Sequence, residues 1–208
     1  MSVTTPRILK AGSLLILALF GQANAEGDNR SDRIAATVQD SFVAKRQAGM
    51  DRITQDYTQR QCTQYADAPL PGTVSAEIMR RNRATIKPPS DGVFLGDVTA
   101  GEAVARRGRG LQSSDDPAKP AGGNCYACHE LAPEELAFGT LGPSLRQYGK
   151  LRGDSQFVLD YTWGKLYNSN AHIPCSNMPR FGHQGILTEQ QLKDVMAYLL
   201  DPASPVNQ

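Results

Sequence analysis

The sequence has no large excess of positive or negative charge, because its 22 lysine and arginine residues nearly balance its 21 aspartate and glutamate residues. A protein that binds nucleic acid normally carries a basic stripe along one face. Here only two short arginine clusters occur, at positions 80–83 and 106–109, and they indicate solvated helix faces or a docking edge for an acidic partner protein. We therefore expect no nucleic-acid partner.

A long hydrophobic run is also missing. The longest apolar stretch covers residues 11–20, whereas a membrane-spanning helix needs roughly 20 apolar residues. The stretch follows Arg7 and Lys10 and precedes Ala23-Asn24-Ala25, which fits the small-x-small rule for signal peptidase. We predict a cleaved signal peptide at residues 1–25, export to the periplasm and no stable membrane insertion. An uncleaved interfacial anchor is the alternative.

The sequence contains little strand-like alternation, has no internal repeat, and only 7% of its residues are aromatic. It predicts an all-α protein whose short helices are joined by long loops rich in proline and glycine. Such a chain has too little apolar side chain for a self-sufficient core, which favours folding around a large apolar ligand. We expect a helical or irregular N-terminal extension over residues 26–95 and a compact domain over residues 96–208.

Helix signals mark five segments of the chain. Thr99 and Glu102 form a capping-box pattern at the start of the third segment, and Thr188 and Gln191 form another at the start of the fifth. The predicted helices cover residues 28–65, 74–83, 99–107, 155–167 and 189–200, and the last has an apolar stripe of Leu192, Val195, Met196 and Leu199.

Cysteine is scarce, at four residues, and two of the four lie in the motif Cys125-Tyr126-Ala127-Cys128-His129. This is the pattern of c-type haem attachment. Two thiols separated by two residues can reach the two vinyl groups on one edge of a porphyrin and form thioethers. The next residue then lies beneath the ring as the proximal iron ligand. The motif predicts one covalent haem c, held by Cys125, Cys128 and His129.

Two other interpretations of the motif are weaker. A thioredoxin-like redox pair needs a preceding strand within a βαβ unit. A zinc site needs a second pair of ligands at comparable spacing. The sequence shows neither pattern.

The second axial ligand of the iron is expected from the long loop over residues 168–187. Met178 lies there in Asn177-Met178-Pro179, and the proline restricts Met178 to extended conformations, which suits a weak thioether ligand. His183 and His172 are the alternatives. Met/His ligation raises the reduction potential relative to bis-His ligation, as an electron acceptor requires.

Two further features are expected to support these ligands. The carbonyl of Pro143 is well placed to accept the Nδ1 proton of His129, which would fix the ring and its basicity. The two remaining cysteines, Cys62 and Cys175, are an even pair in an oxidising compartment and predict a disulfide. That bond would tie the extension to the loop of Met178. Free or partner-linked thiols are the alternative.

Three stretches of the chain carry a family resemblance. They are Gly123-Asn124-Cys125-Tyr126-Ala127-Cys128-His129, Gly139-Thr140-Leu141-Gly142-Pro143-Ser144-Leu145 and Asn177-Met178-Pro179-Arg180-Phe181-Gly182. Together they resemble SoxX, the monohaem subunit of the SoxAX cytochrome complex of thiosulfate-oxidising bacteria. The resemblance covers roughly residues 96–202. The methionine stretch combined with Gly-Pro-Ser-Leu is more specific than the haem motif alone, and Cys175 departs from the family pattern.

The resemblance implies a class I cytochrome c fold with His129 and Met178 as axial ligands. SoxX pairs with SoxA, which carries the catalytic haem, and the complex joins thiosulfate oxidatively to a cysteine of the carrier protein SoxYZ. In that scheme this chain has no catalytic residue and passes electrons from the partner's haem to a soluble cytochrome c. The alternatives are a free-standing periplasmic electron carrier and a monohaem peroxidase, whose open iron site would exclude Met178 as a ligand.

Overall fold

The computed structural model describes residues 32–208, which fall into two compact units. One unit contains residues 32–44 and 49–53, with a helix at residues 32–41 and the 3-10 helix η1 (Met50–Ile53). The other contains residues 45–48 and 54–208. The signal peptide predicted at residues 1–25 lies outside the described residues.

The prediction of one continuous helix over residues 28–65 is wrong for the described part, residues 32–65. The first helix ends at residue 41, and α2 (Tyr57–Gln64) begins only after an irregular stretch. In that stretch Lys45 and Ala48 exchange backbone hydrogen bonds around Arg46, whose φ of 54° lies in the left-handed region. A left-handed residue cannot continue a right-handed helix, so the helical pattern of the sequence is interrupted here.

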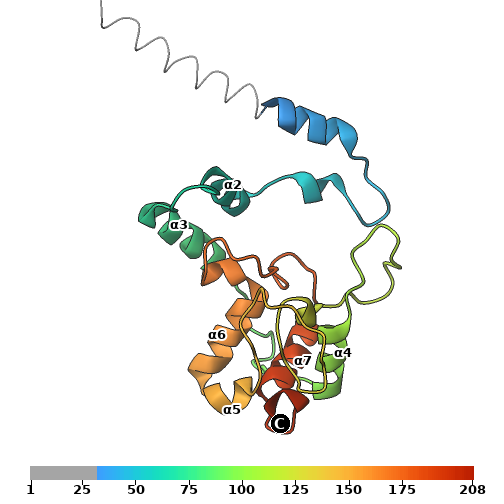
Figure 1. Cartoon of the computed structure of the whole chain (residues 1–208), viewed down its shortest axis with the longest axis vertical. Coiled ribbons are helices and arrows are strands. Elements are labelled where there is room, and N and C mark those ends of the chain that lie inside the picture. The colour runs from blue at the N-terminus through green and yellow to red at the C-terminus, as the bar shows by residue number, and fades with distance from the viewer. Residues whose placement is uncertain (1–31) are drawn as a thin grey trace, which may run out of the picture. The chain divides into compact units, whose positions relative to one another are not determined.

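The larger unit is built from helices alone, as Figure 1 shows. No strand occurs among residues 32–208, where pairing is limited to one isolated bridge, so the all-α prediction is confirmed. Within the same range no helix combines the length and apolar character needed to cross a membrane. Besides α2, the elements are α3 (Gly72–Arg83), α4 (Val98–Arg106), η2 (Cys125–Ala127), α5 (Tyr148–Arg152), α6 (Gln156–Tyr167), η3 (Ser169–Ala171), α7 (Glu189–Leu200) and η4 (Pro205–Asn207).

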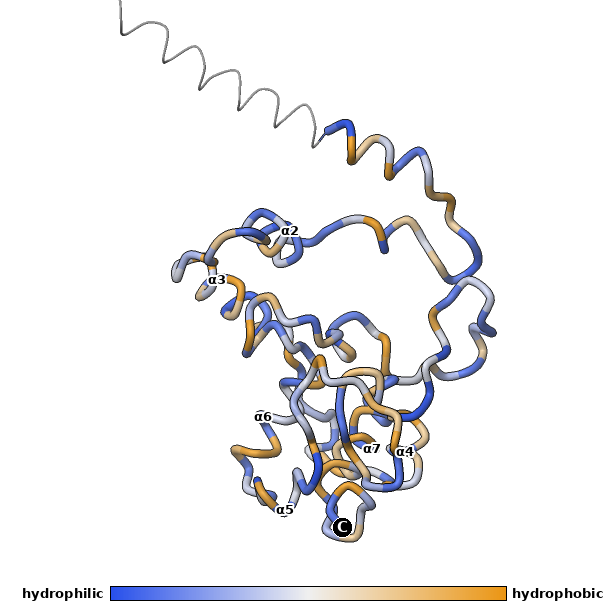
Figure 2. Tube along the Cα trace, in the orientation of Figure 1, coloured by the Kyte–Doolittle hydropathy of each residue, from blue (hydrophilic) through white to orange (hydrophobic). Residues whose placement is uncertain are grey.

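The centre of this unit is the contact between α4 and α7 (Figure 1). Gly101 lies against α7 so closely that a Cβ atom there would be 2.0 Å from the Asp194 carbonyl oxygen and 2.8 Å from Cβ of Tyr198. The backbones of the two helices therefore meet directly at this point, which only a residue without a side chain permits. Hydrophobic residues gather around α7 (Figure 2), where every residue from 192 to 200 is buried.

The two predicted capping boxes have different outcomes. Thr188 and Gln191 form the predicted box at the start of α7, with both hydrogen bonds present. The box predicted at Thr99 and Glu102 is wrong. The N-cap of α4 is Asp97, whose carboxylate accepts from the Ala100 N–H and whose own N–H donates to Asp194 of α7. Glu102 instead forms an ion pair of 2.9 Å with Arg106.

Residues 54–95 of the extension pack within the same unit as the rest of the chain from residue 96. Ile78 of α3 is fully buried, and Asn82 lies in a buried polar contact, donating to Thr58 and accepting from Asn168. The Trp163 indole donates to the Lys87 carbonyl at 2.8 Å. Residues 54–95 therefore pack against α6 and η3 of the same unit.

Candidate functional site

The Cys-X-X-Cys-His motif forms a single tight turn, the 3-10 helix η2. Asn124 enters the turn in the left-handed conformation (φ 49°), which asparagine tolerates better than most residues. The backbone N–H groups of Cys128 and His129 then donate to the Cys125 carbonyl at 3.1 and 2.9 Å. This turn holds the two cysteines and the histidine on one short piece of backbone.

Tyr126, between the two cysteines, anchors the turn to α7. Its buried hydroxyl lies 2.6 Å from the Tyr198 hydroxyl and accepts from the Ala132 N–H at 3.3 Å. Burial and the Tyr126 hydroxyl raise the pKa of Tyr198, so Tyr198 stays neutral. Sequence reasoning missed this pair; its signal was a tyrosine inside the motif and a second one within the apolar C-terminal helix.

The His129 ring is held by the loop over residues 139–145. Its Nδ1 lies 2.7 Å from the Pro143 carbonyl oxygen, the contact proposed from the sequence. Because a carbonyl only accepts, Nδ1 is the donor, and in the neutral ring this tautomer leaves the lone pair on Nε2. A Cβ on Gly142 would lie 2.2 Å from Cε1 of His129, so the loop reaches the ring only because residue 142 is glycine.

Gly139 has the same steric role one step earlier in this loop. A Cβ there would lie 1.9 Å from the Ala127 carbonyl oxygen. The loop is joined to the motif by backbone hydrogen bonds of 2.8 Å, from Gly139 N–H to Tyr126 and from Gly142 N–H to Cys128. The two glycines of the Gly-Thr-Leu-Gly-Pro stretch therefore let the loop lie directly on the turn.

Cys125 and Cys128 are free thiols rather than a disulfide. Burial raises the pKa of the Cys125 thiol to about 12, whereas redox-active Cys-X-X-Cys pairs have a lowered thiol pKa. No strand precedes the turn in the part of the chain that the structure describes, and that part contains no group of three or more His, Cys, Asp or Glu side chains arranged to bind a metal ion. The thioredoxin-like and zinc interpretations therefore have no support.

Met178 lies in a loop whose backbone is fixed on both sides of the residue. Its N–H donates to the Ser176 hydroxyl at 3.2 Å, and its carbonyl accepts from the Ser169 hydroxyl of η3 at 2.6 Å. The side chain is half-buried and packs against the hydrophobic core that contains Tyr126 and Leu187. The loop over residues 174–180, called the methionine loop below, thus presents one thioether in a defined place.

Of the two alternative histidine ligands, His172 packs on α6 with its Nε2 buried and without a hydrogen-bond partner among the described residues. His172 lies edge-on against Tyr161 at 5.0 Å between ring centroids, and burial lowers the pKa of His172. Its Nε2 would lie 2.7 Å from a Cβ on Gly164, so this ring packs on α6. Burial, followed by the charge of Arg180, lowers the pKa of His183.

The methionine loop is joined to α2 by two contacts. Cys62 and Cys175 form a disulfide, with Cα atoms 5.7 Å apart. Asp56, the N-cap of α2, forms an ion pair of 2.6 Å with the buried Arg180. Burial alone would raise the pKa of Asp56, but hydrogen bonds from the Gln59 N–H and Arg180 hold it below its ordinary value. Sequence reasoning missed this ion pair, because neither residue stands out by spacing.

The residues around the motif fit a haem c. The donor set consists of two unpaired thiols, an imidazole with Nε2 free and a thioether. The segment that follows the motif also exposes large apolar side chains, with Leu136 89% and Leu141 69% exposed, beside Phe138. Apolar surface of this kind is what a porphyrin would cover.

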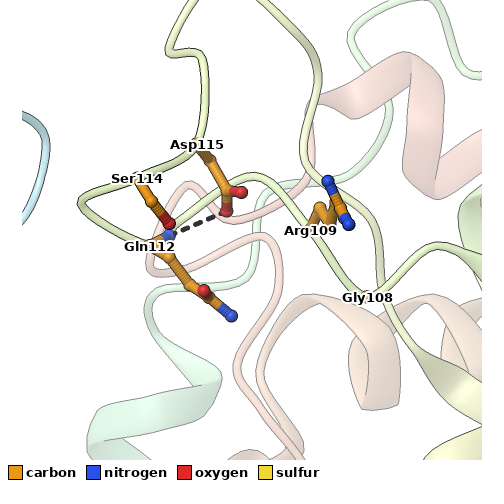
Figure 3. Close-up of a pocket in the computed structure, with 5 residues that line it drawn as sticks. All are labelled: Gly108, Arg109, Gln112, Ser114 and Asp115. Carbon is orange, nitrogen blue, oxygen red and sulfur yellow. Dashed lines mark hydrogen bonds between the residues drawn. The ribbon is translucent and has the colours of Figure 1, made fainter.

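A separate cavity lies in the loop over residues 108–115 (Figure 3). It has a volume of about 540 Å³, and Figure 3 shows Arg109 and Asp115 among its lining residues. The Asp115 carboxylate accepts from the Gly110 and Gln112 N–H groups, which lowers its pKa. Neither a thiol nor an imidazole lines this cavity, so it is separate from the candidate haem site.

Comparison with known proteins agrees with this site. The cytochrome c family profile matches residues 118–201, which include the motif turn, the 139–145 loop and the methionine loop. A domain of this family carries covalently bound haem c and transfers electrons, and the class I fold predicted from the sequence is confirmed.

Two individual proteins are similar to the chain. A chain from the crystal structure of SoxXA from P. pantotrophus has a TM-score of 0.39 at 23% identity, over 56% of this chain and 88% of that one. An uncharacterized lipoprotein of Aquifex aeolicus (strain VF5) is 38% identical over 156 residues, which are 74% of this chain and 73% of the relative. The chain therefore belongs to the family of this Aquifex lipoprotein, and it contains a cytochrome c domain.

Proposed function

We propose that this protein is a periplasmic monohaem cytochrome that serves as the electron-accepting subunit of a SoxAX-type complex. Cys125 and Cys128 would hold the one haem covalently, and His129 and Met178 would be the axial ligands of its iron. In this role the chain forms no bond to the sulfur substrate. It receives electrons from a SoxA-like haem subunit and passes them to a soluble cytochrome c.

The observation that carries the electron-transfer role is the fixed orientation of His129. The Pro143 carbonyl holds the Nδ1 proton at 2.7 Å, so Nε2 is the only ring nitrogen with a lone pair for a metal. Haem c supplies one-electron iron chemistry when it is bound. The residues of this chain hold the ring still, and electron transfer is fastest when ligands move little between oxidation states.

The fixed position of Met178 favours a function in electron transfer over a function as an enzyme. Its backbone is fixed through Ser169 and Ser176, and its loop is tied to α2. As the second ligand of a bound haem iron, Met178 would leave no open coordination position for a peroxide or another small substrate. The monohaem peroxidase interpretation, which needs such a position, is therefore disfavoured.

The SoxAX role is supported by the sequence resemblance of the Gly-Pro-Ser-Leu and Asn-Met-Pro-Arg-Phe-Gly stretches. In SoxAX, thiosulfate is joined to a cysteine thiol of a SoxYZ-like carrier, which removes two electrons and one proton. A monohaem subunit accepts such electrons singly and needs a high potential, and Met/His ligation raises the potential relative to bis-His ligation.

The proposal is tested by tagging the chain in a thiosulfate-oxidising host and purifying it at low salt. We expect a second, haem-bearing polypeptide to copurify in equal amount, and thiosulfate with carrier protein to reduce the haem of this chain. Elution as a monomer at low salt would contradict the SoxAX role. It would favour the free-standing carrier, for which residues 96–208 hold all the proposed ligands.

A further inference from the structure

We infer that α2 of the N-terminal extension is a positioning element for Met178, joined to the methionine loop on both sides of that residue. One tie is the Asp56–Arg180 ion pair and the other is the Cys62–Cys175 disulfide. The inference rests on the proposed ligation of iron by Met178. It assigns a role in that ligation to residues outside the segment that the cytochrome c profile matches.

The two ties bracket Met178 in the sequence. Cys175 lies three residues before it and Arg180 two residues after it, and their partners lie near the two ends of α2. Two attachments fix the loop in rotation as well as in position, which a single attachment cannot do. Small displacements of Met178 are therefore coupled to movement of the whole helix.

The ion pair can act as a tie because Arg180 is buried. Its side chain is only 6% exposed, and the guanidinium lies 2.6 Å from the Asp56 carboxylate. The Asp56 side chain is 42% exposed, so the pair is buried on the arginine side only. Removal of the Asp56 charge would still leave the buried guanidinium without its counter-charge, which is unfavourable. Without the Asp56 charge, Arg180 would have to move toward water, and the loop two residues from Met178 would move with it.

Packing alone leaves the methionine loop room to move. A cavity of about 310 Å³ lies between α2 and this loop, and Thr58, Cys62, Met178 and Arg180 are among its lining residues. Side chains beside a cavity lack part of the contacts that would hold them. The covalent bond and the ion pair across this cavity therefore restrain the loop in addition to the hydrogen bonds that Met178 makes with Ser169 and Ser176.

The variant Asp56→Asn isolates the ion pair. Asparagine is as good an N-cap as aspartate, so α2 keeps its start while Arg180 loses its counter-charge. Asp91→Asn is the matched control, because Asp91 likewise accepts a backbone N–H, from Val93, and pairs at 2.7 Å with a buried cation, Lys193, far along the chain from the methionine loop. Asp56→Glu restores the charge, and the double variant Cys62→Ser/Cys175→Ser removes the second tie.

The measurement is displacement of Met178 by imidazole in the oxidised, haem-loaded protein, followed through the weak far-red methionine–iron band. Imidazole binds only when the loop is open, so its apparent affinity reports the open fraction. We expect Asp56→Asn and the double serine variant each to raise that affinity by at least about tenfold. Asp91→Asn and Asp56→Glu should stay within about twofold of the wild type.

The Asp56–Arg180 ion pair and the Cys62–Cys175 disulfide are together called the clamp. The outcomes distinguish failure of the clamp from failure of the proposed ligation by Met178. A wild-type protein without the far-red band would refute ligation by Met178 and the inference with it. A wild-type band, with imidazole affinities unchanged in both clamp variants, would overturn the clamp and leave the proposed function standing. Circular dichroism and thermal unfolding check that the variants fold. An equal rise in affinity in Asp91→Asn would show a general loss of stability and also overturn the clamp.

Discussion

Replacement of Gly142 by alanine tests how the loop holds His129. The new Cβ would lie 2.2 Å from Cε1 and 2.5 Å from Nδ1 of the ring. Non-bonded carbon atoms in contact lie about 3.5–4.0 Å apart, so the loop and the ring must separate by more than about 1 Å. The hydrogen bond from Nδ1 to Pro143, now 2.7 Å, then exceeds the usual limit of about 3.2 Å.

The expected loss combines two effects. Overpacking of a close contact costs about 1–3 kcal/mol, and a lost hydrogen bond costs about 0.5–1.5 kcal/mol. The free energy of unfolding of the haem-loaded protein should therefore fall by about 1.5–4.5 kcal/mol in equilibrium denaturation. The reduction potential should rise, because an imidazole without its Nδ1 partner is a weaker donor to the iron.

Gly72→Ala is the matched control for this substitution. Gly72 is the first residue of α3, and a Cβ there would meet nothing within 4 Å. Its unfolding free energy should stay within about 0.5 kcal/mol of the wild type or rise slightly. A Gly142→Ala protein with the stability and the potential of the wild type would refute the reasoning, because the contact with His129 would then be easily relieved.

Three further outcomes are expected. Met178→Ala should abolish the far-red band of the oxidised protein and lower its potential, and a band that survives would show that another residue is the ligand. Tyr198→Phe should lower the free energy of unfolding by about 1 kcal/mol, because Tyr126 loses its hydroxyl partner in the core. An unchanged denaturation midpoint would exclude that contribution. The pKa of Asp115 lies below its ordinary value of 3.8. The hydrogen bonds that its carboxylate accepts from the Gly110 and Gln112 N–H groups therefore persist above pH 3.8 and are lost as the pH falls through the lowered pKa. Amide resonances of Gly110 and Gln112 should follow that titration, and pH-independent signals would contradict it.

The sequence predicted those parts of the fold that depend on neighbouring residues. The start of α7 was predicted because Thr188 and Gln191 contact each other within one turn, and its stripe repeats at helical spacing. The cap of α4 was predicted wrongly because Asp97 and Thr99 are both suitable, and the choice is made by packing on α7, where the Asp97 N–H donates to Asp194. Local patterns do not contain that information.

The candidate site shows the same limit. The haem-attachment chemistry of the Cys-X-X-Cys-His motif could be predicted from the sequence, because it depends only on the spacing of the two cysteines and the histidine. The support of the motif comes from distant segments: Tyr198 lies 72 residues from Tyr126, and Asp97 lies 97 residues from Asp194. The partner of Arg180 could not be predicted either, because a buried arginine in a loop can pair with any exposed carboxylate that the fold brings near.

The Cys62–Cys175 disulfide closes a loop that contains both cysteines of the motif. Four cysteines can pair completely in three ways, and each of these occupies Cys125 and Cys128, which stay available for thioether formation only when Cys62–Cys175 forms alone. In an unfolded chain the nearby pair closes far more readily than one separated by 113 residues, since loop-closure entropy grows with loop length. We therefore expect that, in an oxidising compartment, a reductant would be needed to keep the motif open until haem is attached. The long-range disulfide is then best formed last, when the folded domain has brought its two cysteines together.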